Sequence, residues 1–204
     1  MKHNMSKTDG LKSKTIEIIA GPNGSGKTTF ANVYLIGKKR RAVYFNPDLI
    51  ASGIAPLDFE RASIHAGRVL IEQIKVMISQ KQSFAFESTL SGRTWFTLLK
   101  GTTSHGYQIT VYFLYLDSIN KNLQRINKRV RLGGHPIPPE AVHRRHPRCF
   151  DNFWNLYRDI CTDWYVFDNS GKKPKLLQDK IAFEKLSLDK QMAFAATFLK
   201  GKTP

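Results

Sequence analysis

Residues 20–30 read AGPNGSGKTTF, and this stretch constrains the fold more than any other part of the chain. Residues 21–28 match the pattern GxxxxGK[ST], follow a β-rich run and precede a helical run. Glycines at these positions let backbone N–H groups curve around phosphate oxygens, next to a helix N-terminus. The sequence therefore predicts a strand, a phosphate-binding loop and a helix in direct succession.

The residues of this loop have separate expected roles. The ammonium group of Lys27 is expected to span the β- and γ-phosphates of ATP, and the Thr28 hydroxyl is expected to reach Mg²⁺. ATP and Mg²⁺ are therefore the cofactors that the sequence predicts. The expected nucleotide-binding residues are Gly21, Pro22, Asn23, Gly24, Ser25, Gly26, Lys27, Thr28 and Thr29.

Short apolar runs alternate with helical runs along the rest of the chain, as in parallel sheets covered on both faces. We predict a P-loop kinase-like α/β fold: a three-layer sandwich with a mostly parallel sheet of five or six strands, in the order 2-3-1-4-5, and a helical lid. The aromatic residues of 150–157 recur at helical spacing, which favours a core-facing stripe. The expected strands are residues 15–20, 42–45, 83–86, 108–116 and 164–167, with an edge strand or hairpin at 175–183. The expected helices are residues 27–36, 59–79, 94–103, 118–131, 140–157 and 188–200.

Length and composition favour one domain and an anionic ligand. A chain of 204 residues suits a single core, so we expect a flexible basic tail at 1–14 and one domain at 15–204. Its 32 Lys and Arg against 16 Asp and Glu give a net charge of +16, which favours polyanionic ligands. Two cysteines, and no run as long as a membrane span, lead us to expect a cytoplasmic protein without membrane contact.

Three carboxylates follow predicted strands, at the edge of the sheet where ligands bind in such folds. Asp48 is the candidate base that accepts a proton from a substrate hydroxyl, and the alternative is that it caps a helix. Glu87 ends the strand FAFE and could reach metal, water or substrate; a structural role is the alternative. Asp117 follows a strand that imitates a Walker B strand, but it also precedes a helix that it could cap.

Residues 121–148 contain eight basic residues and one acid. Two expected helices carry this charge, and the segment LGGHPIPP joins them with a glycine hinge and rigid prolines. This composition is typical of a lid, which we expect at about residues 129–148, and closing it would bring arginines to a transferring phosphate. The alternative is a solvated basic face.

Several segments together resemble the zeta toxin family of P-loop kinases, over roughly residues 15–171. Besides the phosphate loop they are FNPDLIASG, RASIHAGRVLIEQI, SFAFESTLSGRT, RVRLGGHPIPPEAVHRRHPR and WYVFDNSG. Studied members of this family phosphorylate UDP-N-acetylglucosamine, and its toxins are neutralised by a small helical antitoxin. The resemblance therefore implies an ATP- and Mg²⁺-dependent kinase with an alcohol acceptor, a nucleotide-sugar substrate and an antitoxin as partner.

The resemblance also implies residue roles. Asp48 takes the part of the base, and Lys27 and Thr28 hold the triphosphate and the metal. Glu87 and Thr89 face the acceptor and bind it.

The phosphate-contacting arginines are implied in the same way. Arg131 and Arg144 resemble the pair that contacts phosphates during transfer, while Arg129 and Arg145 are alternatives because they are close helical neighbours. Residues 168–169 are placed near the nucleotide base.

Two other functions stay open at this point. The charge of +16 is compatible with a polynucleotide or RNA kinase, or with a kinase of another metabolite, although nucleic acid is not the favoured partner. A non-catalytic protein that binds a partner in a nucleotide-dependent way, within a toxin–antitoxin system, is the third alternative. Only a kinase requires the carboxylate of Asp48 for its effect.

Overall fold

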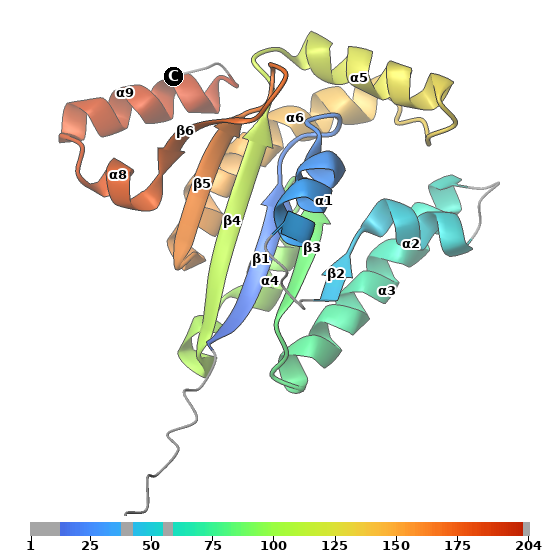
Figure 1. Cartoon of the computed structure of the whole chain (residues 1–204), viewed down its shortest axis with the longest axis horizontal. Coiled ribbons are helices and arrows are strands. Elements are labelled where there is room, and N and C mark those ends of the chain that lie inside the picture. The colour runs from blue at the N-terminus through green and yellow to red at the C-terminus, as the bar shows by residue number, and fades with distance from the viewer. Residues whose placement is uncertain (1–12, 38–42, 55–58, 202–204) are drawn as a thin grey trace, which may run out of the picture.

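A computed structural model of the protein describes residues 13–37, 43–54 and 59–201. Its centre is a six-stranded sheet with the order β2-β3-β1-β4-β5-β6 (Figure 1). The first five strands are parallel, and β6 pairs antiparallel with β5 at the edge, so the predicted fold class is confirmed. The strands are β1 (Lys14–Ala20), β2 (Val43–Phe45), β3 (Phe84–Ser88), β4 (Tyr107–Tyr115), β5 (Asp163–Asp168) and β6 (Lys175–Asp179).

Most predicted helices are present, and the short helix α7 lies beyond the helix expected at 140–157. The segment after β2 forms a short helix, α2, which was not among the expected helices. The helix expected at 94–103 ends at Leu99, because the chain turns at Lys100 and Gly101 has a φ of 91°. The region 175–183 is the strand β6 followed by α8. The helices are α1 (Lys27–Gly37), α2 (Pro47–Ile54), α3 (Phe59–Ser79), α4 (Thr94–Leu99), α5 (Ile119–Arg131), α6 (Pro139–Asn152), α7 (Arg158–Ile160), α8 (Lys180–Glu184) and α9 (Leu188–Leu199).

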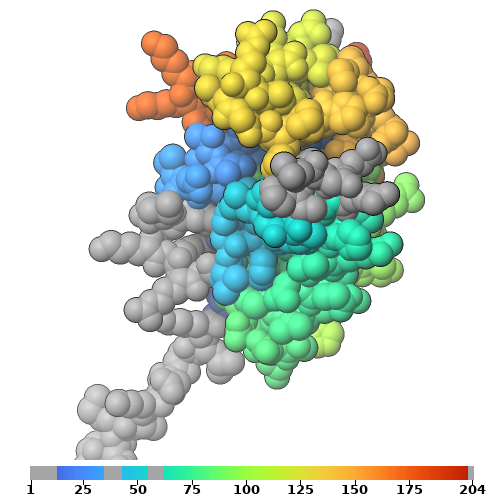
Figure 2. All heavy atoms as spheres, turned by 90° about the vertical axis from the view of Figure 1, so that its right-hand side faces the viewer, coloured from blue at the N-terminus to red at the C-terminus, as the bar shows by residue number. Residues whose placement is uncertain are grey.

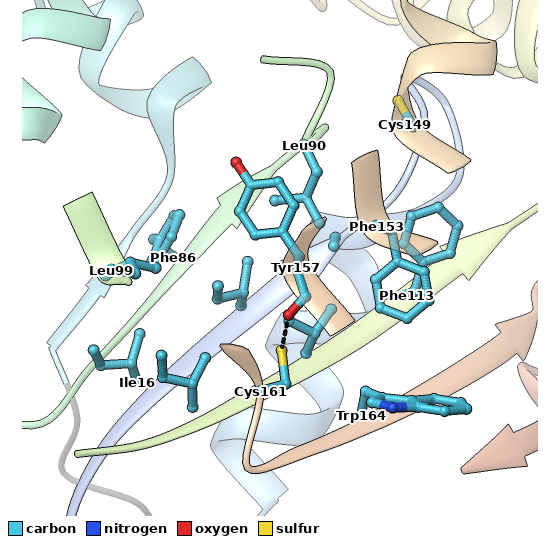
Figure 3. Packing of buried hydrophobic residues seen from close by; sticks show 14 of the residues in the cluster. Ile16, Phe86, Leu90, Leu99, Phe113, Cys149, Phe153, Tyr157, Cys161 and Trp164 are labelled. Carbon is cyan, nitrogen blue, oxygen red and sulfur yellow. Dashed lines mark hydrogen bonds between the residues drawn. The ribbon is translucent and has the colours of Figure 1, made fainter. Parts of the chain in front are cut away.

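The larger hydrophobic core lies on one face of the sheet. Alternation along β1 directs Ile16 and Ile18 to this face, where they pack with residues of α3, α4, α6 and α9. The helix α6 continues into a π-helical stretch, Phe153–Tyr157, that lies against the strands (Figure 3). The predicted aromatic stripe of residues 150–157 is therefore confirmed as core.

The opposite face of the sheet is covered by α1 (Figure 1). Ile19 of β1 and Leu114 of β4 point to this face and pack with Ala31 of α1. The phosphate-binding loop joins β1 to α1, so packing on this face fixes the start of the helix relative to the sheet.

Both cysteines lie in the core of the protein. Cys149 and Cys161 are free thiols that are both buried, and burial raises the pKa of Cys149 to about 12.

Residues 1–12 of the expected tail lie outside the described residues, and Lys14 already belongs to β1. No helix in the described parts of the chain is long and apolar enough to cross a membrane.

Candidate active site

A cavity of about 300 Å³ lies at the carboxyl ends of β1 and β3, next to the start of α1. It combines backbone of the phosphate loop with side chains from α2, β3 and α5. The residues that line it are Asn23, Gly24, Gly26, Lys27, Thr28, Thr29, Pro47, Asp48, Glu87, Ser88, Thr89, Arg125 and Arg129.

The phosphate loop has the strained backbone that its glycines predict. Gly21 has a φ of 136°, and a Cβ there would lie 1.9 Å from the carbonyl oxygen of Leu114. Side chains from two other segments hold the loop in place. Asn122 of α5 donates to the carbonyl of Asn23 at 2.7 Å, and Asn169 after β5 donates to the carbonyl of Ser25 at 2.7 Å.

Substitution of Asn169 by Ala is expected to lower the affinity for ATP about fivefold, because one hydrogen bond contributes about 1 kcal/mol. The reason is that the Ser25 carbonyl loses its donor and the loop becomes less fixed. Calorimetric titration with ATP and Mg²⁺ measures this change. Asn155→Ala, which removes an exposed amide bonded to Asp151, is the matched control. An unchanged dissociation constant for Asn169→Ala would show that this contact does not order the loop.

Lys27 begins α1 and places a positive charge in the cavity. Its Nζ donates to the carbonyls of Gly21 at 2.9 Å and Pro22 at 3.0 Å. Burial lowers the pKa of Lys27 below its ordinary value, and the carboxylate of Glu87 opposes this effect. A partly buried ammonium group beside a glycine loop and a helix N-terminus is suited to bind the negative charge of a triphosphate.

Oxygen atoms converge beside Lys27. The hydroxyl of Thr28 donates to Glu87 Oε2 at 3.0 Å, while Asn46 Nδ2 and the Tyr44 hydroxyl both donate to Glu87 Oε1; the amide contact is 3.1 Å. A hydroxyl and a carboxylate at this distance fit the oxygen-rich coordination of Mg²⁺. Thr28 and Glu87 are thus the residues that could hold the ion. Thr89 also lines the cavity, and its hydroxyl contacts that of Ser91 at 2.8 Å.

Asp48 lies in the first turn of α2, but it does not cap this helix. The side chain of Asn46 accepts hydrogen bonds from the backbone N–H of Asp48 at 2.8 Å and of Leu49 at 3.2 Å. Asn46 is therefore the cap, and Asn followed by Pro47 is the local signal that could have identified it. The carboxylate of Asp48 lines the cavity instead and forms an ion pair with Arg129 at 3.3 Å.

Two arginines of α5, Arg125 and Arg129, line the cavity one helical turn apart. Arg125 Nη2 donates to the carbonyl of Asn169 at 2.8 Å, and Arg129 Nη2 donates to that of His135 at 2.9 Å. The Nε of Arg129 is buried and has no hydrogen-bond partner among the described residues. Both guanidinium groups are thus positioned to meet the charge of a phosphate.

The arginines that the resemblance favoured lie elsewhere. Arg131 is exposed on α5 and is not among the residues that line this cavity. Arg144 and its neighbour Arg145 line a second, separate cavity. The structure brings the alternative Arg129 to the site, together with Arg125, another member of the basic segment 121–148.

Asp117 fits neither of its expected roles. Its carboxylate forms an exposed ion pair with Lys121 at 2.7 Å, and it does not line the cavity. Ser118 is the N-cap of α5, because its side chain accepts from the N–H of Asn120 at 3.2 Å. The acid that meets Thr28 is Glu87, near the end of β3, the strand next to β1.

The sequence is similar to those of a known protein family and of one bacterial relative. The zeta toxin family matches over residues 2–174. An uncharacterised protein of Haemophilus influenzae is 32% identical over 136 residues, which are 67% of this chain and 94% of that protein.

Solved structures share the fold at low sequence identity. The PezAT chromosomal toxin–antitoxin system of Streptococcus pneumoniae has a TM-score of 0.61 at 12% identity, covering 97% of this chain and 90% of that one. AvrRxo1-ORF1:-ORF2 with ATP has a TM-score of 0.61 at 13% identity, covering 96% and 78%. The Pnkp1/Rnl/Hen1 RNA repair complex has a TM-score of 0.58 at 19% identity, covering 74% and 49%.

The family match spans most of the chain and includes the phosphate loop, the β3 acid and the basic helices α5 and α6. The chain therefore belongs to the zeta toxin family and has a P-loop kinase-like fold.

Proposed function

We propose that the protein is an ATP- and Mg²⁺-dependent kinase that transfers the γ-phosphate to a hydroxyl of a small molecule. The observation that carries this proposal is the position of Asp48. Its carboxylate lies on the wall of the same 300 Å³ cavity as Lys27, Thr28 and Arg129. A base, a triphosphate cradle and cationic groups are the parts that phosphoryl transfer to an alcohol needs.

The proposed reaction assigns one step to each group. Asp48 accepts the proton of the acceptor hydroxyl, whose oxygen forms a bond to the γ-phosphorus. The bond from that phosphorus to the β–γ bridging oxygen breaks, and ADP leaves with its electron pair. Lys27, Arg125 and Arg129 stabilise the charge on the transferring group. Mg²⁺, held by Thr28 and Glu87, would neutralise charge on the β- and γ-phosphates.

UDP-N-acetylglucosamine is the acceptor that we propose to test first, since the chain belongs to a family whose studied members use it. Incubation with radiolabelled ATP, Mg²⁺ and this nucleotide sugar is expected to give a labelled sugar product. Asp48→Asn should give product at a rate about 10³-fold lower. If another metabolite is labelled and this nucleotide sugar is not, the proposed acceptor is wrong but the proposed kinase function stands. If a metabolite extract gives no labelled product that depends on Asp48, the proposed kinase function is contradicted.

A polynucleotide acceptor is a second candidate because the chain carries a net charge of +16. An oligonucleotide with a 5′-hydroxyl end, added to the same assay, tests it. Transfer that falls steeply with salt would support this acceptor.

Family membership also supports an antitoxin protein as a partner, as the PezAT system of the structural neighbour is named a toxin–antitoxin system. Growth arrest by the wild-type protein but not by Asp48→Asn would connect toxicity to phosphoryl transfer.

A further inference from the structure

Asn46 lies between the carboxylate that could hold Mg²⁺ and the helix that carries Asp48. It follows β2 and is buried, with 5% of its surface exposed. Its Nδ2 donates to Glu87 Oε1 at 3.1 Å, and its Oδ1 accepts from the backbone N–H groups of Asp48 at 2.8 Å and Leu49 at 3.2 Å. One side chain therefore connects the end of β3 to the first turn of α2.

Capping of α2 does not by itself require an amide at this position. Ser, Asp and Asn cap helices about equally well, because each supplies an acceptor oxygen. Among these three side chains, only that of Asn has a separate NH₂ group, whose donors stay free while the oxygen accepts the cap. In this structure the NH₂ group of Asn46 meets Glu87 and lies 3.4 Å from the hydroxyl oxygen of Thr28. The amide therefore contributes to the cavity as well as to the helix.

The two carboxylate oxygens of Glu87 have different neighbours. Oε1 accepts from two donors at the end of β2, Asn46 Nδ2 and the hydroxyl of Tyr44. Oε2 accepts from the hydroxyl of Thr28, the other residue that could hold the ion. Because the residue is buried, with 6% of its surface exposed, these contacts fix how the carboxylate is turned. They leave Oε2 on the side of Thr28.

Helix α2 lies on the outside of the domain and packs chiefly against α3, through Ala51 and Ala62. Figure 2 shows α2 at the surface of the molecule, below α5. Pro47 disfavours a helical backbone at the residue before it, which fixes where α2 begins. The first turn of α2, with Asp48, is therefore joined to the wall of the cavity at Asn46.

We propose that Asn46 is a positioning residue, which orients the carboxylate of Glu87 for Mg²⁺ and couples binding of the ion to the placement of Asp48. This inference rests on the proposed function, from which it takes the roles of Glu87 and Asp48. It adds that the helix carrying the base is held most firmly when Glu87 binds the ion. Loss of the amide then weakens binding of the nucleotide with Mg²⁺ more than binding of the nucleotide alone.

Asn46→Ser separates the two contacts of this residue. Serine keeps an acceptor oxygen for the cap of α2, but its shorter side chain has no amide to donate to Glu87. Calorimetric titration of the full chain with a non-hydrolysable ATP analogue, once with Mg²⁺ and once with EDTA, measures the gain in affinity that the ion provides. We expect this gain to fall about fivefold in the variant, the effect of one hydrogen bond, while the affinity in EDTA changes less than about twofold.

Asn155→Ser is the matched control, because it removes an exposed amide that bonds to Asp151 outside the cavity. It should leave both affinities unchanged. For Asn46→Ser, a gain within about twofold of the wild-type value would overturn the inference. A purely structural role gives that result, because it weakens binding with Mg²⁺ and with EDTA alike. Absence of any gain from Mg²⁺ in the wild-type protein would overturn the inference as well.

Amide hydrogen exchange tests the coupling in the wild-type protein, without any variant. The N–H groups of Asp48 and Leu49 bond to Asn46, so their exchange reports how firmly the first turn of α2 is held. With the ATP analogue bound, we expect exchange to be about fivefold slower in Mg²⁺ than in EDTA, because coupling between two sites acts equally in both directions. Equal rates in the two conditions would contradict the coupling.

No acceptor is present in either measurement. If the protein shows both effects but transfers no phosphate, the proposed kinase function is contradicted and this inference is supported. If the protein transfers phosphate but Asn46→Ser leaves the gain from Mg²⁺ unchanged, the kinase function stands and the inference is wrong.

Discussion

Substitution of Asp48 by Asn is expected to lower the rate of phosphoryl transfer by about 10³-fold, within the range for loss of a general base. The amide keeps the size of the carboxylate but cannot accept the proton of the acceptor hydroxyl. Helix α2 should persist, because Asn46 provides its cap. The affinity for ATP should change little, since Lys27 and the loop backbone remain. Steady-state kinetics with ATP and the acceptor, together with ATP calorimetry, separate the two effects.

Asp117→Asn is the matched control for this prediction. Asp117 also follows a strand, but its carboxylate is exposed, pairs with Lys121 and does not line the cavity. Its substitution should leave the transfer rate within twofold of the wild-type rate. A large loss for Asp117→Asn, or a small one for Asp48→Asn, would show that the base has been wrongly assigned.

Substitution of Arg129 by Gln is expected to reduce kcat by about 10³-fold, the lower end of the range for an arginine that stabilises a transferring phosphate. Arg129 lines the cavity, contacts Asp48 at 3.3 Å and has a buried Nε without a partner in the described part of the chain. Its loss therefore removes charge from the phosphate site and leaves the carboxylate of Asp48 without its cation. Single-turnover kinetics at saturating ATP measure the chemical step apart from binding.

Arg131→Gln discriminates between the two assignments of the phosphate-contacting arginine. The resemblance implies that Arg131 contacts the phosphate, whereas the structure places Arg131 at the exposed surface and Arg129 in the cavity. On the structural assignment, Arg131→Gln changes kcat only a few-fold. If Arg131→Gln had the larger effect of the two, the assignment to Arg129 would be wrong.

The fold could be predicted because its signals are local. The phosphate loop is specified by glycines whose positive φ values few other residues adopt, as at Gly21 and Gly26. The strands β1 and β4 end in continuous apolar runs, residues 18–20 and 111–115, so alternation with helices identified a parallel sheet. Helix α2 was missed because it has only eight residues and starts with Pro47, just after the short strand β2.

The arginines could not be assigned from sequence, because the choice depends on how α5 is rotated. That rotation is set by tertiary contacts: Asn122 donates to the loop at Asn23, and Ile126 lies beside Gly24. These contacts turn Arg125 and Arg129 toward the cavity, three and seven residues after Asn122. Helical spacing alone gives residues that share a face, but not which face meets the phosphate loop.

Glu87 illustrates a similar limit. Sequence position correctly indicated an acid at the end of β3, but not its neighbours. Its contacts with Thr28, Tyr44 and Asn46 arise because β3 lies between β1 and β2 in the sheet. That order is a property of the whole sheet, and it places Glu87 next to the hydroxyl expected to reach Mg²⁺.

The most direct test of this account is a crystal structure with Mg²⁺ and a non-hydrolysable ATP analogue. We expect the γ-phosphate to lie between Lys27 and Arg129, with the carboxylate of Asp48 facing it across a gap that an acceptor hydroxyl can enter. A γ-phosphate bound with Asp48 turned away, and with no such gap, would contradict the proposal that this chain phosphorylates an alcohol.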